Sequence, residues 1–232
     1  MTTTTSSTSE RSGDRALPVR VLLRPVATAL PLDFLALGVA TFSFAAVQLR
    51  WVPPTEGHTI ALGVLVLTVP LQLLAAVMGF LSRDPVAATG MGILAGTWAT
   101  VSLATPTAAP GAASAGLRVV LLCSACCLLV PATAARAKLV PAAVILLSAT
   151  RFAVTGVAEI DGGRGWMQAA GWTGVALAVL SLYAALALEL EGSESRTVLP
   201  LGRRRAARDA LVGSPADQVR GISHEPGVRR QL

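Results

Sequence analysis

Charged residues are scarce in this chain, and their scarcity excludes an ordinary soluble domain. Only 14% of the 232 residues are charged and 53% are hydrophobic, whereas a soluble domain contains about 25% charged residues. Four long stretches contain no Asp, Glu, Lys or Arg at all: residues 59–82, 85–117, 119–135 and 165–188. Because a helix that crosses a bilayer needs about 20 mostly apolar residues, these stretches predict an integral membrane protein.

Sequence signatures of catalysis and metal binding are missing as well. The chain has two histidines and no P-loop, dinucleotide-binding glycine motif or H-E-x-x-H motif. Its cysteines lie in one apolar run without a histidine or carboxylate nearby, so we expect small buried packing residues and not a metal or disulfide site. These cysteines are Cys123, Cys126 and Cys127. We therefore expect no enzyme activity, no cofactor and no metal.

The two ends of the chain are polar and are predicted to be tails. Residues 1–16 are rich in Thr and Ser and lack the apolar centre of a cleavable signal peptide, so we expect a disordered cytoplasmic tail over residues 1–25. Residues 192–232 are rich in arginine and are interpreted as a basic cytoplasmic tail that contacts anionic lipid headgroups. Nucleic-acid binding would need more than a short basic tail.

Residues 26–191 are predicted to form one transmembrane domain with six spans. Proline, glycine and charged residues bound the apolar runs, which cover about 31–49, 60–81, 86–104, 117–135, 139–158 and 166–190. The predicted fold class is all-α: a polytopic membrane protein built as a six-transmembrane-helix bundle.

The distribution of basic residues predicts the orientation of this bundle, because basic segments remain on the cytoplasmic side during insertion. With the N-terminus inside, 15 of the 19 basic residues lie in inner segments. The residues that fall outside are Arg50, Arg118 and Arg164. We therefore expect both termini in the cytoplasm. Abundant alanine and a single lysine, Lys138, favour a bacterial source and hence the bacterial cytoplasmic membrane.

Three motifs lie at a fixed spacing in the last predicted span and the residues after it. They read Ala-Gly-Trp-Thr-Gly at 170–174, Leu-Tyr-Ala at 182–184 and Arg-Thr-Val-Leu-Pro-Leu-Gly at 196–202. Together they resemble the acetate uptake transporter family, the small succinate–acetate/proton symporters, whose last helix opens with A-G-W-x-G, carries a mid-helix tyrosine and precedes R-T-V-L-P-x-G. Gln72 and Trp98 also lie at family-like positions, and the likeness covers about residues 25–202.

The resemblance implies a ring-shaped homo-oligomer in which each protomer holds its own pathway. Family members narrow this pathway with bulky side chains on the first, third and fifth helices, and the corresponding residues here are Leu37, Leu94 and Ser148, with Leu147 beside the last. Leucine replaces the usual aromatic residue twice, and serine replaces an apolar residue once. The family's Asn-Pro opening is absent. The resemblance therefore implies a constriction that is wider or more polar than in its relatives.

Arg151 lies about 12 residues into the fifth predicted span. An arginine near the bilayer centre costs about 2.5–3.5 kcal/mol even on the lenient insertion scale, so such a residue usually faces a cavity or a partner. Ser148, Arg151 and Thr155 share one helix face, which we expect to point into the bundle or a water-filled path. Two interpretations remain open: Arg151 attracts a small carboxylate, or it is structural and bonds backbone carbonyls or a neighbouring subunit.

Asp33 lies near the cytoplasmic end of the first span, about 15 Å from Arg151 along the helix direction, which is too far for an ion pair. It stands where the family usually has glycine. We expect Asp33 to cap the first helix at its positive dipole end, with proton coupling as the alternative. In the second span, Thr68 and Gln72 form a polar face that suits either helix packing or a pathway wall.

The sequence predicts a transporter or channel-like permease for small monocarboxylates such as acetate, with succinate as a further candidate. Transport would be passive or proton-coupled. The expected partners are the carboxylate anion, protons, the lipid bilayer and other copies of the chain. The alternative is a non-transporting or differently selective six-span membrane protein that retains the family scaffold.

Overall fold

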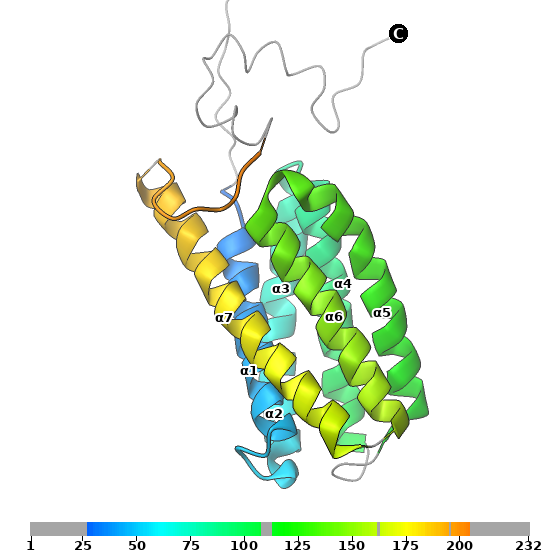
Figure 1. Cartoon of the computed structure of the whole chain (residues 1–232). Coiled ribbons are helices and arrows are strands. Elements are labelled where there is room, and N and C mark those ends of the chain that lie inside the picture. The colour runs from blue at the N-terminus through cyan, green and yellow to red at the C-terminus, as the bar shows by residue number, and fades with distance from the viewer. Residues whose placement is uncertain (1–26, 108–112, 162, 195, 205–232) are drawn as a thin grey trace, which may run out of the picture.

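The protein is described by a computed structural model over residues 27–107, 113–161, 163–194 and 196–204. Within these residues six helical segments are long and apolar enough to cross a membrane: Leu30–Gln48, Pro54–Leu81, Pro85–Thr107, Ala115–Ala137, Leu139–Ile160 and Arg164–Glu194. Figure 1 shows them packed lengthwise as one bundle. The prediction of an all-α, six-helix membrane fold is confirmed.

The first, fifth and sixth spans are single α-helices, the third and fourth end in a short 3-10 turn, and the second span is composite. The elements in chain order are α1 (Leu30–Gln48), η1 (Pro54–Glu56), α2 (Gly57–Gly63), η2 (Val64–Thr68), α3 (Val69–Leu81), α4 (Pro85–Ala104), η3 (Thr105–Thr107), α5 (Ala115–Ala134), η4 (Ala135–Ala137), α6 (Leu139–Asp161) and α7 (Arg164–Glu194). The second and last spans extend several residues beyond the apolar runs, because a helix continues past the hydrocarbon layer into polar sequence.

The second span contains a π-helical segment, η2, directly before Pro70 at the start of α3. A proline inside a helix has no N–H to donate and collides with the carbonyl one turn earlier. A single turn of wider helix accommodates this ring without breaking the span.

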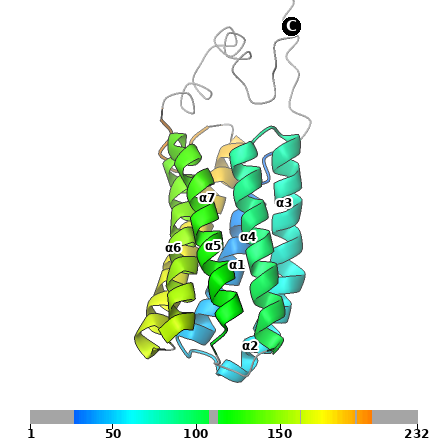
Figure 2. The same ribbon diagram turned by 90° about the vertical axis from the view of Figure 1, so that its right-hand side faces the viewer.

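The spans form a closed ring in chain order. Each of the later spans packs against the next, from α3 to α7, and α1 contacts both α3 and α7. Figure 1 shows α7 beside α1, and Figure 2 shows α6, α5, α4 and α3 in succession across another side. Successive spans run in opposite directions along the bundle. We call the end where α1 begins and α7 ends the proximal end, and the opposite end the distal end (Figure 1).

Small buried residues allow the helices to approach closely. Ala40 and Ala45 of α1 and Ala184 of α7 are fully buried. At the α3–α4 hairpin a Cβ on Gly79 would lie 3.0 Å from the backbone of Ala88. Helices in a bilayer gain packing energy from such close contacts, because lipid supplies no hydrophobic drive for their association.

The outer surface of the bundle is apolar, as a lipid-facing surface requires. Val66 of η2 and Val130 of α5 are 73% and 71% exposed. All three cysteines are exposed on α5, so the expectation that they are buried is wrong. Nearly every residue of this helix is apolar, and the sequence therefore does not distinguish its inner face from its outer one.

The residues after α7 cross the proximal end and complete the start of α6. The first N–H groups of a helix lack partners within it, and here Leu139 and Val140 donate to the carbonyls of Gly202 and Leu201, both at 3.2 Å. Gly202 has a φ of +64°, a conformation that favours glycine. The Tyr183 hydroxyl donates to the Pro200 carbonyl at 2.9 Å. The tyrosine and the Arg-Thr-Val-Leu-Pro-Leu-Gly motif therefore have a structural role in this chain.

Candidate functional site

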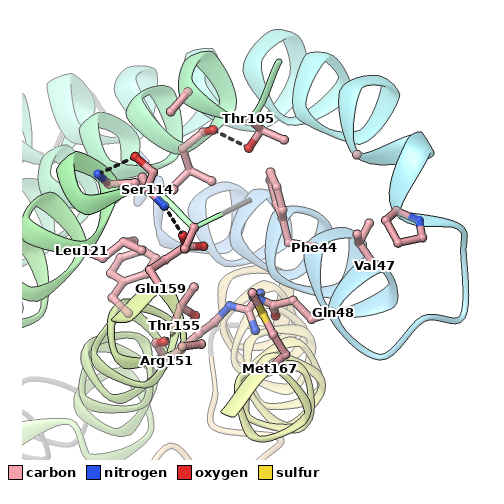
Figure 3. Close-up of a pocket in the computed structure, with 18 of the residues that line it drawn as sticks. Phe44, Val47, Gln48, Thr105, Ser114, Leu121, Arg151, Thr155, Glu159 and Met167 are labelled. Carbon is pink, nitrogen blue, oxygen red and sulfur yellow. Dashed lines mark hydrogen bonds between the residues drawn. The ribbon is translucent and has the colours of Figure 1, made fainter. Parts of the chain in front are cut away.

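A cavity of about 320 Å³ opens into the distal end of the bundle. Residues of α1, α2, α4, α5, α6 and α7 and of the distal loops line this distal cavity, and Figure 3 shows many of these side chains directed into it. The wall contains aromatic and aliphatic side chains with a few polar groups, an arrangement typical of small-molecule sites.

Arg151 of α6 lies at the inner end of the distal cavity and is only 2% exposed. Its Nη1 donates to the Ala170 carbonyl at 2.8 Å, and its Nη2 donates to Gln48 Oε1 at 3.3 Å. The guanidinium carbon lies 6.0 Å from the centre of the Trp98 ring. Both hydrogen-bond acceptors are neutral, and no carboxylate forms an ion pair with Arg151 among the residues that the structure describes. The guanidinium is thus held in place while its charge is not compensated.

Two glycines of the Ala-Gly-Trp-Thr-Gly motif make room for this arrangement. A Cβ on Gly174 would overlap the Arg151 guanidinium and lie 3.0 Å from Ala45, and a Cβ on Gly171 would lie 2.5 Å from the Leu49 side chain. The motif that carries the family resemblance therefore seats the buried arginine against α7. The sequence identified the motif and the arginine but did not connect them.

The other members of the predicted polar face on α6 lie in two different settings. Thr155 lines the distal cavity, and its hydroxyl donates to the Arg151 carbonyl at 2.8 Å. Ser148 is fully buried, donates to the Val144 carbonyl at 2.8 Å, and does not line either described cavity. Leu147 is partly buried against the core. On this face of α6, Arg151 and Thr155 therefore line the distal cavity, whereas Ser148, one turn earlier, packs against other helices.

A second cavity of about 130 Å³ lies at the proximal end and is lined by Asp33, Leu94, Asp84 and Lys138, among others. Lys138 and Asp84, which both line this proximal cavity, form an ion pair at 3.8 Å. Asp33 and Arg151 thus line cavities at opposite ends, in agreement with the separation expected between them.

Asp33 occupies the first turn of α1 but does not cap it, so the capping prediction is wrong. The N-cap is Ala29, and the hydrogen bond to a side chain at this helix start goes from the Leu30 N–H to Thr28 Oγ1 at 3.5 Å and not to Asp33. Asp33 is 1% exposed, and within the described residues its Oδ1 has no hydrogen-bond partner. Gln72 of α3 lies beside this carboxyl, fully buried, but its amide atoms do not reach hydrogen-bond geometry with it or with another described residue.

Aromatic side chains separate the two cavities. Trp98 lines the distal cavity and Leu94, one turn away on α4, lines the proximal one. The Trp98 ring stacks on Phe44 at 5.6 Å and meets Phe152 edge-on at 5.5 Å. Sequence reasoning placed the narrow region at Leu37, Leu94 and Ser148 and missed Phe44 and Phe152. Leu37 is fully buried in the core. The spacing from Leu37 to Phe44, two turns on one helix face, is the signal that would have identified Phe44.

Comparison with known proteins gives a structural match and no sequence match. No family model matches the chain, and no curated protein sequence matches it. The solved structure of the bacterial acetate channel SatP superposes with a TM-score of 0.66 at 20% sequence identity, covering 76% of this chain and 99% of that chain. The chain therefore shares the fold of SatP, which is the fold that the motif resemblance implied.

Proposed function

We propose that this protein is a transporter or channel-like permease for small monocarboxylates such as acetate. The observation that carries the proposal is Arg151, a buried cation at the inner end of the distal cavity that has only neutral partners among the described residues. The fold shared with a bacterial acetate channel supports the same function.

The environment of Arg151 suits a carboxylate with a short apolar tail. Guanidinium offers five N–H donors in a planar fork that matches a carboxylate, and its attraction for an anion is stronger in a low-dielectric site than in water. Phe44, Trp98 and Phe152 provide apolar wall next to it. The cavity volume of about 320 Å³ lies at the small end of the range for ligand pockets, about 300–1,000 Å³.

Uptake of labelled acetate into proteoliposomes tests this function. We expect Arg151→Gln to lower uptake at subsaturating acetate by about tenfold or more, because one charge-assisted interaction contributes about 1.5–3 kcal/mol and each 1.4 kcal/mol is a factor of about ten. Arg151→Lys should retain part of the uptake. Arg136→Gln is the matched control, since it also removes one positive charge but lies exposed at the proximal end outside both cavities. Equal uptake by the wild type and a folded Arg151→Gln variant would exclude the role assigned to Arg151.

The proposal extends to proton coupling through Asp33. Asp33 and Gln72 are both buried, and Asp33 Oδ1 and the amide atoms of the Gln72 side chain have no hydrogen-bond partner within the described chain. A buried unpaired charge is costly, and a proton on Asp33 would remove that charge and supply a donor for the Gln72 carbonyl. The other charged groups at this cavity, Asp84 and Lys138, pair with each other.

We further propose that the proximal end faces the cytoplasm of a bacterial cell. Arg83, Arg136, Lys138 and Arg203 lie at this end, which the positive-inside rule assigns to the cytoplasm. The distal cavity would then open outward. A C-terminal fluorescent-protein fusion should fluoresce, and an alkaline phosphatase fusion at the same position should be inactive. The ring-shaped homo-oligomer remains a prediction from the family resemblance.

A further inference from the structure

Glu159 lines the distal cavity together with Arg151. Arg151, Thr155 and Glu159 are four residues apart on α6 and therefore share one helix face. At 1.5 Å per residue, Glu159 lies about 12 Å further along the helix than Arg151. Because α6 runs from the proximal to the distal end (Figure 1), a solute that enters the distal cavity meets Glu159 before Arg151.

The Glu159 carboxylate is fixed in place but not neutralised. Its Oε2 accepts a hydrogen bond from the Ser114 N–H at 2.8 Å (Figure 3), and the Ser114 hydroxyl caps the start of α5. No basic side chain forms an ion pair with Glu159 in the described part of the chain. The other ionisable groups at this cavity are Arg50, His58 and Arg164, which are exposed, and Arg151.

The closed inner end of the cavity determines how a dicarboxylate would lie. Trp98, stacked on Phe44 and in edge contact with Phe152, leaves little room beyond Arg151. A dicarboxylate that places one carboxylate at Arg151 must therefore direct its second carboxylate back toward Glu159. A monocarboxylate directs an uncharged tail there.

We propose that Glu159 is a specificity-determining residue that disfavours dicarboxylates at this site; the proposal rests on the proposed function of Arg151. Glu159 repels the carboxylate at Arg151 of every solute, and this common effect cancels when two solutes are compared. The second charge of a dicarboxylate adds a repulsion that a monocarboxylate does not experience. Two like charges about 10 Å apart at an effective dielectric constant of about 20 change a binding constant by roughly tenfold. Glu159 thus selects by charge number, whereas Arg151 attracts any carboxylate.

The test compares two competitors that share a four-carbon chain and differ in charge. Succinate carries two charges at neutral pH, and monomethyl succinate carries one. Each is used to inhibit labelled acetate uptake into proteoliposomes that contain the wild type or Glu159→Gln. The glutamine retains an oxygen that can accept the Ser114 N–H bond. We expect the potency of succinate relative to monomethyl succinate to rise by about tenfold in Glu159→Gln.

Two control variants separate charge from structure. Glu159→Asp keeps the charge and should keep the wild-type potency ratio within about threefold. Glu56→Gln removes a negative charge at the same end but outside the cavity wall, and it should leave the ratio unchanged. An unchanged ratio in Glu159→Gln, or an equal loss of potency for both competitors, would overturn the proposal.

Binding measurements separate this inference from the proposed function. The two competitors are also tested for thermal stabilisation of the purified protein, which requires binding but not transport. If the wild type moves no acetate while Glu159→Gln still changes the ratio of stabilisation, the transport proposal fails and the charge selection stands. If the ratio of thermal stabilisation by succinate to that by monomethyl succinate is the same in the wild type and in Glu159→Gln, the proposed charge selection is wrong.

Discussion

The two cavities each contain one buried ionisable side chain, but the two side chains differ in their hydrogen-bond partners. Arg151 at the distal cavity is held by the Ala170 carbonyl and the Gln48 amide oxygen, whereas Asp33 at the proximal cavity has an unpaired oxygen beside an unpaired Gln72 within the described residues. Arginine stays charged under nearly all conditions and needs fixed acceptors. A carboxyl group can instead accept a proton, so its surroundings need not satisfy a permanent charge.

The largest expected effect comes from the glycine that seats the arginine. Gly174→Ala places a methyl group where the guanidinium lies, and overpacking of this kind typically costs about 1–3 kcal/mol. We expect a lower melting temperature in detergent and uptake reduced by more than about tenfold, since Arg151 must also move. Gly165→Ala on the same helix has open space and should change neither property. If Gly174→Ala has the melting temperature and uptake of the wild type, the close contact between Gly174 and the Arg151 guanidinium is not required.

The second prediction concerns the proximal cavity. We expect Asp33→Asn to lower acetate uptake driven by a pH gradient by about fivefold or more, while exchange of acetate without a gradient changes by less than about twofold. Uptake in the variant should also lose most of its pH dependence. Asp84→Asn, which removes a carboxylate from the same cavity, should retain the pH dependence. Identical pH profiles for Asp33→Asn and the wild type would rule out a coupling role.

The third prediction tests how firmly the arginine must be held. Gln48→Leu removes one of the two acceptors of Arg151 and leaves the Ala170 carbonyl in place, so the guanidinium is displaced only in part. We therefore expect the apparent KM for acetate to rise about threefold with a smaller change in maximal rate. Gln168→Leu, an exposed residue at the same cavity, is the control. If both variants behave alike, the Gln48 bond has no functional role.

The smallest expected effect concerns the unpaired amide beside Asp33. Gln72→Leu removes two polar atoms without partners, so we expect the free energy of unfolding to stay within about 1 kcal/mol of the wild type. Thr68→Val, one turn away, removes the 3.1 Å hydrogen bond to the Ala36 carbonyl and should destabilise the protein more. The reverse order, measured by thermal melting in detergent, would mean that Gln72 has a partner such as an ordered water.

Sequence reasoning recovered the fold better than it recovered the site. Charge-free runs identify spans because no charged residue can face lipid cheaply, and Arg151 was conspicuous for the same reason. Phe44 and Phe152 were missed because an aromatic residue in a span is unremarkable until its neighbours from other helices are known. The prediction that the cysteines are buried is wrong for a related reason. In a helix that is apolar on all sides, the sequence pattern does not show which face points inward.

The amino-acid sequence by itself determined that six helices cross the membrane and that one arginine is buried among them, because both follow from the cost of placing charge in hydrocarbon. Only the tertiary structure decided what surrounds that arginine. Gly174 and Gln48 come from α7 and α1, and their contacts with Arg151 of α6 depend on the close approach of separate helices. Helix packing, which hydrophobic patterning specifies poorly inside a bilayer, thus sets the chemistry of the distal cavity.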